Sequence, residues 1–346
     1  MTTLTDLLGT SLPVIQAPMA GVQGASLALA VTQAGGLGSL PAATLTPEAL
    51  RRDLLALRER TTAPLNVNFF CHVQPEPDSQ REAAWRAMLA PYYAEFGLDP
   101  GAVVAGPARS PFNHDLADVL AELPVAVVSF HFGLPSSDLL ERVRATGAKV
   151  TSSATTVDEA RWLQAQGVDA IIAQGLEAGG HRGHFLSDDL DAQAGTFALL
   201  PQIVRAVRVP VIAAGGIADA GGVAAARALG AVGVQVGTAY LLCPEATTSA
   251  VHREALTADA GGTTTLTNLF TGRPARGIRN RLMRELGAMR ADVPAFPLAA
   301  GAVSPLRGKA EAQGNGDFSP LWAGQNTTGC HNVPAADITR ELARGW

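Results

Sequence analysis

The feature that most limits how this chain can fold is a regular alternation of short β-branched runs with longer segments rich in alanine and leucine. Eight such runs occur. A helix-like segment lies between most of them, and several of these segments end in glycine, as helices commonly do. This alternation is typical of βα units, and eight units predict an α/β fold of the (β/α)8 TIM barrel type. The predicted strands span residues 13–19, 36–40, 65–70, 125–133, 149–156, 169–175, 210–216 and 233–241.

Two stretches interrupt the alternation. Residues 72–124 are too long for a single crossover between strands, so we expect an inserted helical segment there. Residues 245–346 follow the eighth strand and contain RNRLMREL and DITRELARGW, which predict helices. We therefore predict a barrel over residues 1–244, interrupted by the insertion. A C-terminal helical extension over residues 245–346 would contribute to a smaller helical substrate domain.

Composition argues against several classes of protein. The net charge is −5 and the arginines are scattered, so we expect no nucleic-acid partner. Polar residues or glycines interrupt every apolar run well short of a membrane-spanning length, so we expect no membrane partner. The N-terminus lacks the basic and apolar regions of an export signal, and the three cysteines are far apart and odd in number. These features predict a cytoplasmic protein, and they leave its oligomeric state open.

In a barrel of this kind the active site lies at the carboxyl ends of the strands. Glycines gather at the ends of the sixth, seventh and eighth predicted strands, where they let backbone N–H groups approach a ligand closely. Barrels bind phosphate at these loops, and a threonine hydroxyl there can add a hydrogen bond. We therefore predict a phosphate site. The residues concerned are Gly179, Gly180, Gly215, Gly216, Gly237 and Thr238.

Polar side chains also stand at strand ends, among them Asn68, Ser153 and Gln174. The two amides can donate and accept hydrogen bonds at once, which suits the edge of a flat heterocycle such as flavin. Amides that merely satisfy loop backbone explain either residue alone equally well. The segment QAPM at 16–19 would place a proline and the flexible Met19 thioether against the same ring.

The fourth predicted strand ends in SFHFGLP, which sets His131 between two phenylalanines and just before Gly133. One interpretation is a core histidine satisfied by a backbone carbonyl. The other is a general base at the mouth of an active site, since histidine suits proton transfer near neutrality. A cationic imidazole that holds an anion would also fit this position. His72 is a second candidate just past the third strand, which we assign to loop structure.

Other chemistries lack the residues that they need. Neither of the two lysines lies near the carboxyl end of a strand, which argues against a Schiff-base aldolase. His181 and His184 have a spacing that suggests metal, but no third ligand lies nearby in the sequence, so we predict no metal site. The loop that carries this pair suits a place beside the phosphate, with Arg182 or an imidazole assisting.

Nine stretches together resemble the class I nitronate monooxygenase family, formerly called 2-nitropropane dioxygenases. They lie between residue 13 and about residue 326 and are PVIQAPMAG, AGGLGS, NVNFFCH, SFHFGLP, AQGLEAGGHRG, PVIAAGGI, VQVGTAYLLCPE, GRPARGIRNR and GDFSPLWAGQ. The resemblance implies a barrel that binds FMN non-covalently, with a smaller helical substrate domain. It also implies oxidation of anionic alkyl nitronates by O2, propionate 3-nitronate among them, to a carbonyl product and nitrite. No reduced nicotinamide cofactor would be needed.

The resemblance also implies roles for particular residues. The family's catalytic histidine falls on His131, and Met19 falls in its FMN-facing first-strand motif. The stretches 72–124 and 285–315 resemble the family much less, so the substrate size preference stays open. The family's flavin contacts fall on Asn68, Gln174, Gly179, Gly216, Gln235, Val236, Gly237 and Thr238.

Two other functions are compatible with the sequence. The first is an NADH-dependent FMN barrel reductase of the enoyl-ACP or quinone reductase type, which oxidation of NADH would identify. The sequence shows no GxGxxG fingerprint, but flavin barrels bind nicotinamide without one. The second is a non-catalytic flavin- or phosphate-binding protein on a barrel scaffold. Binding alone does not call for an imidazole at a strand end, which argues against it.

Overall fold

A computed structural model describes residues 3–99, 109–258 and 263–346 of the chain. All eight predicted strands are confirmed, and they form one parallel sheet in the order β1-β9-β8-β6-β5-β4-β3-β2. A parallel bridge between Ile15 and Leu37 joins the two ends of this order, so the sheet closes into a barrel. The strands are β1 Val14–Gln16, β2 Gly38–Pro41, β3 Leu65–Phe70, β4 Val127–His131, β5 Lys149–Ala154, β6 Ala170–Gln174, β8 Val211–Ala214 and β9 Gly233–Val236.

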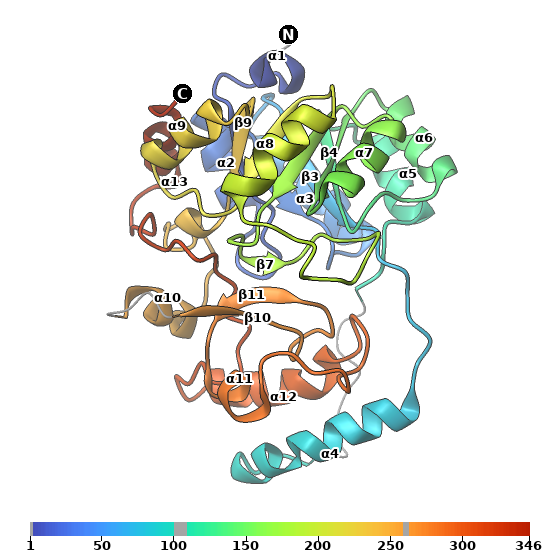
Figure 1. Cartoon of the computed structure of the whole chain (residues 1–346), viewed down its shortest axis with the longest axis vertical. Coiled ribbons are helices and arrows are strands. Elements are labelled where there is room, and N and C mark those ends of the chain that lie inside the picture. The colour runs from blue at the N-terminus through green and yellow to red at the C-terminus, as the bar shows by residue number, and fades with distance from the viewer. Residues whose placement is uncertain (1–2, 100–108, 259–262) are drawn as a thin grey trace.

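Helices surround the barrel on its outer face (Figure 1). Several begin where the sequence supplies a side chain that caps the first turn. The Thr46 side chain accepts from the Ala49 N–H, and that of Asp219 accepts from the Gly222 N–H. The surrounding helices are α2 Ala25–Gln33, α3 Pro47–Arg58, α5 His114–Glu122, α6 Ser137–Ala145, α7 Val157–Ala165, α8 Thr196–Ala206, α9 Ala220–Ala228 and α13 Ala335–Ala343.

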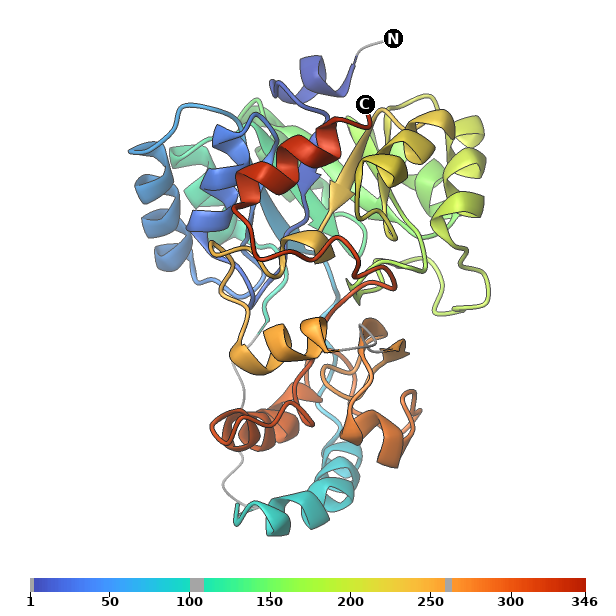
Figure 2. The same ribbon diagram turned by 90° about the vertical axis from the view of Figure 1, so that its left-hand side faces the viewer.

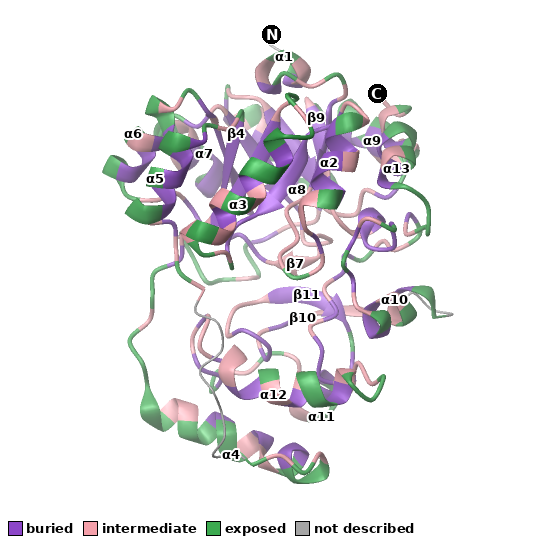
Figure 3. Cartoon of the chain, turned by 180° about the vertical axis from the view of Figure 1, so that it is seen from behind, coloured by how far each residue is buried: buried purple, intermediate pink, exposed green. Residues whose placement is uncertain are grey.

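The main core lies between the strands and these helices, and Figure 3 shows the buried residues concentrated there while the outer helix faces are exposed. A short helix, α1 Leu4–Leu8, covers the amino end of the barrel (Figure 1). Leu4 and Leu8 pack with residues of the inner barrel such as Ile172. A Cβ at Gly233 would lie 2.1 Å from the Leu4 side chain, so this strand position requires glycine. The amino end of the barrel is therefore filled, and the carboxyl end is left for a site.

A smaller unit faces the carboxyl end of the barrel (Figure 1). Its core joins Trp85 and Tyr93 to residues far away in the sequence, such as Leu306. The Trp85 Nε1 donates to the carbonyl of Ala299 at 3.2 Å, and the Tyr93 hydroxyl donates to that of Ala302 at 2.6 Å. The elements of the unit are α4 Ser79–Glu95, α10 Ala250–Thr257, β10 Thr264–Thr267, β11 Ala275–Ile278, α11 Arg281–Leu286 and α12 Ala300–Glu311.

The smaller unit also contains a sheet that the sequence analysis did not predict. Strand β11 pairs antiparallel with β10 and with β7 Gly180–His181, which comes from the loop after β6 of the barrel. This sheet therefore fastens the smaller unit to a loop at the rim of the barrel. The signal in the sequence was weak because β10 and β11 have four residues each and β7 has two.

Both interrupting stretches are divided between the two units. Within residues 72–124, α4 packs on α12, whereas α5 packs on α3 and α6 of the barrel. Within residues 245–346, the last helix α13 returns to the barrel and packs on α2 and α9, as Figure 2 shows. The domain boundary at residue 244 and the substrate role of the smaller unit stay predictions. None of the helices in the described ranges is long and apolar enough to cross a membrane.

Candidate active site

A cavity opens at the carboxyl ends of the barrel strands, next to the smaller unit. Its volume is about 1260 Å³ with the open mouth included, which is enough space for a ligand of cofactor size. Strand ends converge there because the parallel strands of a closed barrel all finish at one rim. Every residue that the sequence assigned to catalysis or to direct cofactor contact lines this cavity: Met19, Asn68, His131, Gln174, Gly179, Gly180, Gly215, Gly216, Gln235, Val236, Gly237 and Thr238.

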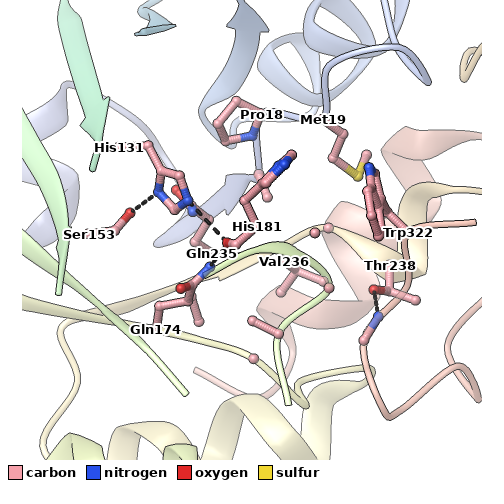
Figure 4. A pocket seen from close by; sticks show the side chains of 18 of the residues that line it. Pro18, Met19, His131, Ser153, Gln174, His181, Gln235, Val236, Thr238 and Trp322 are labelled. Atoms are coloured by element: carbon pink, nitrogen blue, oxygen red, sulfur yellow. Dashed lines mark hydrogen bonds between the residues drawn. The ribbon is translucent and has the colours of Figure 1, made fainter. Parts of the chain in front are cut away.

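His131 is the last residue of β4, and both of its ring nitrogens have partners (Figure 4). The Nε2 atom lies 3.1 Å from the carbonyl oxygen of His181, and Nδ1 lies 2.9 Å from the hydroxyl of Ser153. A carbonyl oxygen only accepts, so this network assigns the proton to Nε2. The Nδ1 lone pair then accepts from the Ser153 hydroxyl. The histidine is oriented at both ends.

The surroundings of His131 favour its neutral form. Burial lowers the pKa of His131 to about 3, and the nearby Arg273 and Arg182 act in the same direction. The hydrogen bond to the His181 carbonyl opposes this shift and is weaker. Near pH 7 the imidazole is therefore neutral, the form that accepts a proton. The cationic interpretation of His131 requires a bound anion to raise this pKa.

The turn after His131 is strained. Phe132 has a φ of 70°, in the left-handed region that bulky side chains rarely adopt, and Gly133 follows with a φ of 86°. The Phe132 ring centre lies 4.6 Å from that of His131 and 4.2 Å from the guanidinium carbon of Arg273. These contacts hold a backbone conformation that costs about 1–3 kcal/mol. The turn ends β4 at His131, whose ring lies at the cavity wall.

The two predicted amides differ in what they are free to bind. Gln174 Nε2 donates to the His181 carbonyl at 3.0 Å, and its Oε1 accepts from the Gly183 N–H at 2.8 Å. Both ends of this amide therefore hold the loop that also positions His131. Asn68 uses its Nδ2 on Ser129 and leaves its Oδ1 without a donor among the described residues. Gln235 makes no side-chain hydrogen bond within the described ranges, so its whole amide is available to a ligand.

The glycine cluster offers unused backbone donors. The N–H groups of Gly215, Gly216 and Gly237 have no acceptor in the part of the chain that the structure describes. A 3-10 helix, η2 Thr238–Tyr240, begins immediately after Gly237. The Thr238 hydroxyl accepts from the Gly324 N–H at 2.9 Å, which leaves its own proton free to be donated. This set of donors at the start of a short helix suits a phosphate group.

The sequence offered Arg182 or an imidazole beside the phosphate, and the structure contradicts the first of these alternatives. Arg182 does not assist at a phosphate, because its side chain is completely buried behind the cavity. Its guanidinium donates to the Gln193 side chain and to the carbonyls of Gly175 and Gln174. The N-terminus of α8 is occupied as well, since both carboxylate oxygens of Glu177 accept from the Thr196 N–H.

Two other histidines, His181 and His72, lie in or close to the walls of the site. His181 lines the cavity, and its Nε2 lies 2.9 Å from the Thr271 hydroxyl. Burial, and after it Arg109, holds the pKa of His181 well below its usual value. His72 does not line the cavity and bonds the carbonyl of Arg109 at 2.9 Å, in agreement with its assignment to loop structure. Among the described residues, no three side chains of the types that bind metals gather at one place.

Sequence reasoning missed several lining residues. Trp322 and Asn326 reach the cavity from the segment that leads back to the barrel, and Arg109 reaches it from the segment between α4 and α5. Trp322 lies in GDFSPLWAGQ, one of the nine stretches that resemble the family, so the sequence did contain a signal for this residue. Arg109 lies in no motif and at no predicted strand end, and only the tertiary structure brings it to the site.

Comparisons with known proteins agree on one relationship. The sequence matches the family described as nitronate monooxygenase over residues 1–345. It is 42% identical over 345 residues to the nitronate monooxygenase of Paraburkholderia phytofirmans, covering 99% of this chain and 94% of that one. It is 43% identical over 341 residues to the nitronate monooxygenase of Pseudomonas aeruginosa, covering 98% and 97%.

Solved structures resemble the whole chain. A nitroalkane oxidase from Streptomyces ansochromogenes is 39% identical with a TM-score of 0.89, and the match covers 99% of this chain and 98% of that one. FabK from Thermotoga maritima is 28% identical with a TM-score of 0.73, and that match covers 100% and 96%. The resemblance to the oxidase is therefore nearer in both sequence and shape than the resemblance to FabK.

Proposed function

Because this chain belongs to the nitronate monooxygenase family, we propose that it oxidises alkyl nitronates with O2 on bound FMN and releases a carbonyl product and nitrite. The observation that carries this proposal is the meeting of a neutral histidine with unused backbone donors in one cavity. The family relationship over residues 1–345 supports a flavin as the cofactor. The nearer likeness to a nitroalkane oxidase than to FabK favours oxidation over the reductase alternative.

The residues present fit FMN. Gly215, Gly216, Gly237 and Thr238 would hold its phosphate, since their donors have no other described partner. The free amide of Gln235 and the Oδ1 of Asn68 would meet the polar edge of its ring system, with Met19 against the ring. In its bound form the flavin would accept electrons from the nitronate and deliver them to O2.

His131 acts on the substrate in this proposal. A neutral nitroalkane must lose a proton from the carbon next to the nitro group before it is a nitronate, and a neutral imidazole can take that proton. The acceptor is Nδ1, because Nε2 is occupied by the His181 carbonyl. The Ser153 hydroxyl would have to turn away from Nδ1 for this transfer. A substrate that arrives as the nitronate needs no such step.

An oxygen electrode tests the proposal. We expect rapid O2 uptake with propionate 3-nitronate and no oxidation of NADH. His131→Asn should lose turnover of nitroethane, which needs a base, and keep turnover of ethyl nitronate. His114→Asn is a matched control, because this histidine is exposed on α5 and lies outside the cavity. Flavin released by denaturation should have the mass of FMN.

Three results would contradict parts of the proposal. NADH oxidation without nitronate turnover would identify a reductase. Bound flavin without turnover of any nitronate would identify a binding protein. If His131→Asn lost turnover of nitroethane and of ethyl nitronate to the same extent, the imidazole would stabilise an anion and would not be a base.

A further inference from the structure

We propose that Arg109 forms a subsite for a carboxylate at the far end of the substrate, so that the enzyme prefers nitronates that carry a second negative group. This inference rests on the proposed function and names a specificity-determining residue for it.

The guanidinium of Arg109 contacts an aromatic ring and no charged or polar group among the described residues. It forms no ion pair and donates no hydrogen bond to any residue in the described ranges. Its contact is with the face of Phe296, whose ring centre lies 5.7 Å from the guanidinium carbon. Arg182, by contrast, donates to three acceptors. Among the described residues that line the cavity, Arg109 is the only lysine or arginine.

An arginine in this position favours an anion as its ligand. Arginine stays protonated in proteins, so its charge cannot be removed by titration near neutrality. Burial, and after it the charge of Arg307, lowers the pKa of Arg109, which shows that its surroundings disfavour the cation. A carboxylate would relieve this cost, and its two oxygens match the guanidinium fork. Glu177, a carboxylate that also lines the cavity, is already bonded to Thr196.

Contacts between rings connect Arg109 to the reacting end of the cavity. Phe296, on which Arg109 lies, has its ring centre 6.2 Å from that of Phe70, and Phe70 lies 5.8 Å from His131. The carbonyl of Arg109 is held by His72 at 2.9 Å, which fixes the backbone at this wall. Thr238, which would hold the cofactor phosphate, lies on the other side of the cavity from His131 (Figure 4). Arg109 is therefore placed toward the substrate and away from the cofactor phosphate.

Two matched substrates isolate this interaction. Propionate 3-nitronate and propyl-1-nitronate have the same three-carbon nitronate chain, and the first carries a carboxylate where the second has a methyl group. For Arg109→Gln we expect kcat/KM with propionate 3-nitronate to fall by about 10- to 100-fold, mainly through KM, as for loss of a charged hydrogen bond. With propyl-1-nitronate we expect a change of less than about threefold. Arg109→Lys keeps the charge and should recover part of the loss.

Arg307→Gln provides the control for removing a nearby positive charge. Arg307 is paired with Glu311 at 2.8 Å on α12 and does not line the cavity, so its substitution should leave both substrates unaffected. Bound flavin should be the same in Arg109→Gln as in the wild type, because Arg109 is placed away from the cofactor phosphate and no described hydrogen bond is lost.

The outcomes separate this inference from the proposed function. If Arg109→Gln lowered kcat/KM equally with both nitronates, or with neither, the carboxylate subsite would be overturned and nitronate oxidation would stand. Absence of turnover by the wild type would instead overturn the proposed function. Calorimetric titration with 3-nitropropionate and 1-nitropropane tests the subsite without turnover. We expect tighter binding of the carboxylate in the wild type and loss of that difference in Arg109→Gln, and an unchanged difference would refute the subsite.

Discussion

Substitution of Gly183 by alanine should displace His131, the proposed catalytic base, without removing any of its hydrogen-bonding groups. A Cβ at this position would lie 2.7 Å from Cε1 of His131 and 3.0 Å from Cβ of Ser153. Carbon atoms prefer separations of about 3.5–4.0 Å, so the imidazole must move by about 1 Å. Gly183 does not have a positive φ, so its backbone accepts alanine without strain.

The expected effect of Gly183→Ala follows from that displacement. A misplacement of about 1 Å costs roughly 100-fold in rate, which corresponds to about 2.7 kcal/mol in the activation barrier. The loss should appear in turnover of nitroethane, which needs the base, measured with an oxygen electrode. Overpacking should also lower the free energy of unfolding by about 1–3 kcal/mol.

Gly308→Ala is the matched control. A Cβ at Gly308 has nothing within 4 Å, and the residue lies in α12 away from the cavity, so the same chemical change should leave turnover unaffected. Bound flavin should be equal in both variants, because Gly183 is not among the lining residues. Turnover of nitroethane by Gly183→Ala within about twofold of the wild type would refute the steric argument.

Three further predictions concern the supporting groups. Ser153→Ala removes the donor that orients Nδ1 of His131, so turnover of nitroethane should fall by about tenfold. An unchanged pH–rate profile would contradict the assigned hydrogen bond. Burial lowers the pKa of His252 to about 4. Between about pH 6.5 and 4 the unfolded chain binds more protons at this histidine than the folded chain does. The free energy of unfolding should therefore decrease as the pH is lowered through this range, by up to about 1.4 kcal/mol per pH unit, and Tm should depend less on pH in His252→Gln. Glu177→Gln weakens the bonds to the Thr196 N–H, and urea unfolding should show a loss of about 1 kcal/mol.

Much of the fold was accessible from the sequence because barrel strands and their helices have local signals. β-branched runs of the right length mark strands, and side chains such as Asp219 mark the starts of helices. The small sheet lacked such a signal, because β7 has only two residues and pairs with a strand about a hundred residues away in the chain. The division of residues 72–124 between two units was equally hidden, since α4 and α5 differ in what they pack against and not in their helical character.

The sequence by itself determined that strand-end residues such as His131, Asn68 and Gly216 share one rim, because parallel strands in a closed barrel all finish at the same end. It did not determine what each side chain is bonded to. Only the tertiary structure shows that Gln174 holds a loop and that Arg182 is satisfied behind the cavity. Arg109 reaches the cavity although it lies in none of the described strands or helices. Contacts between segments so distant in the chain are set by packing, which no local pattern encodes.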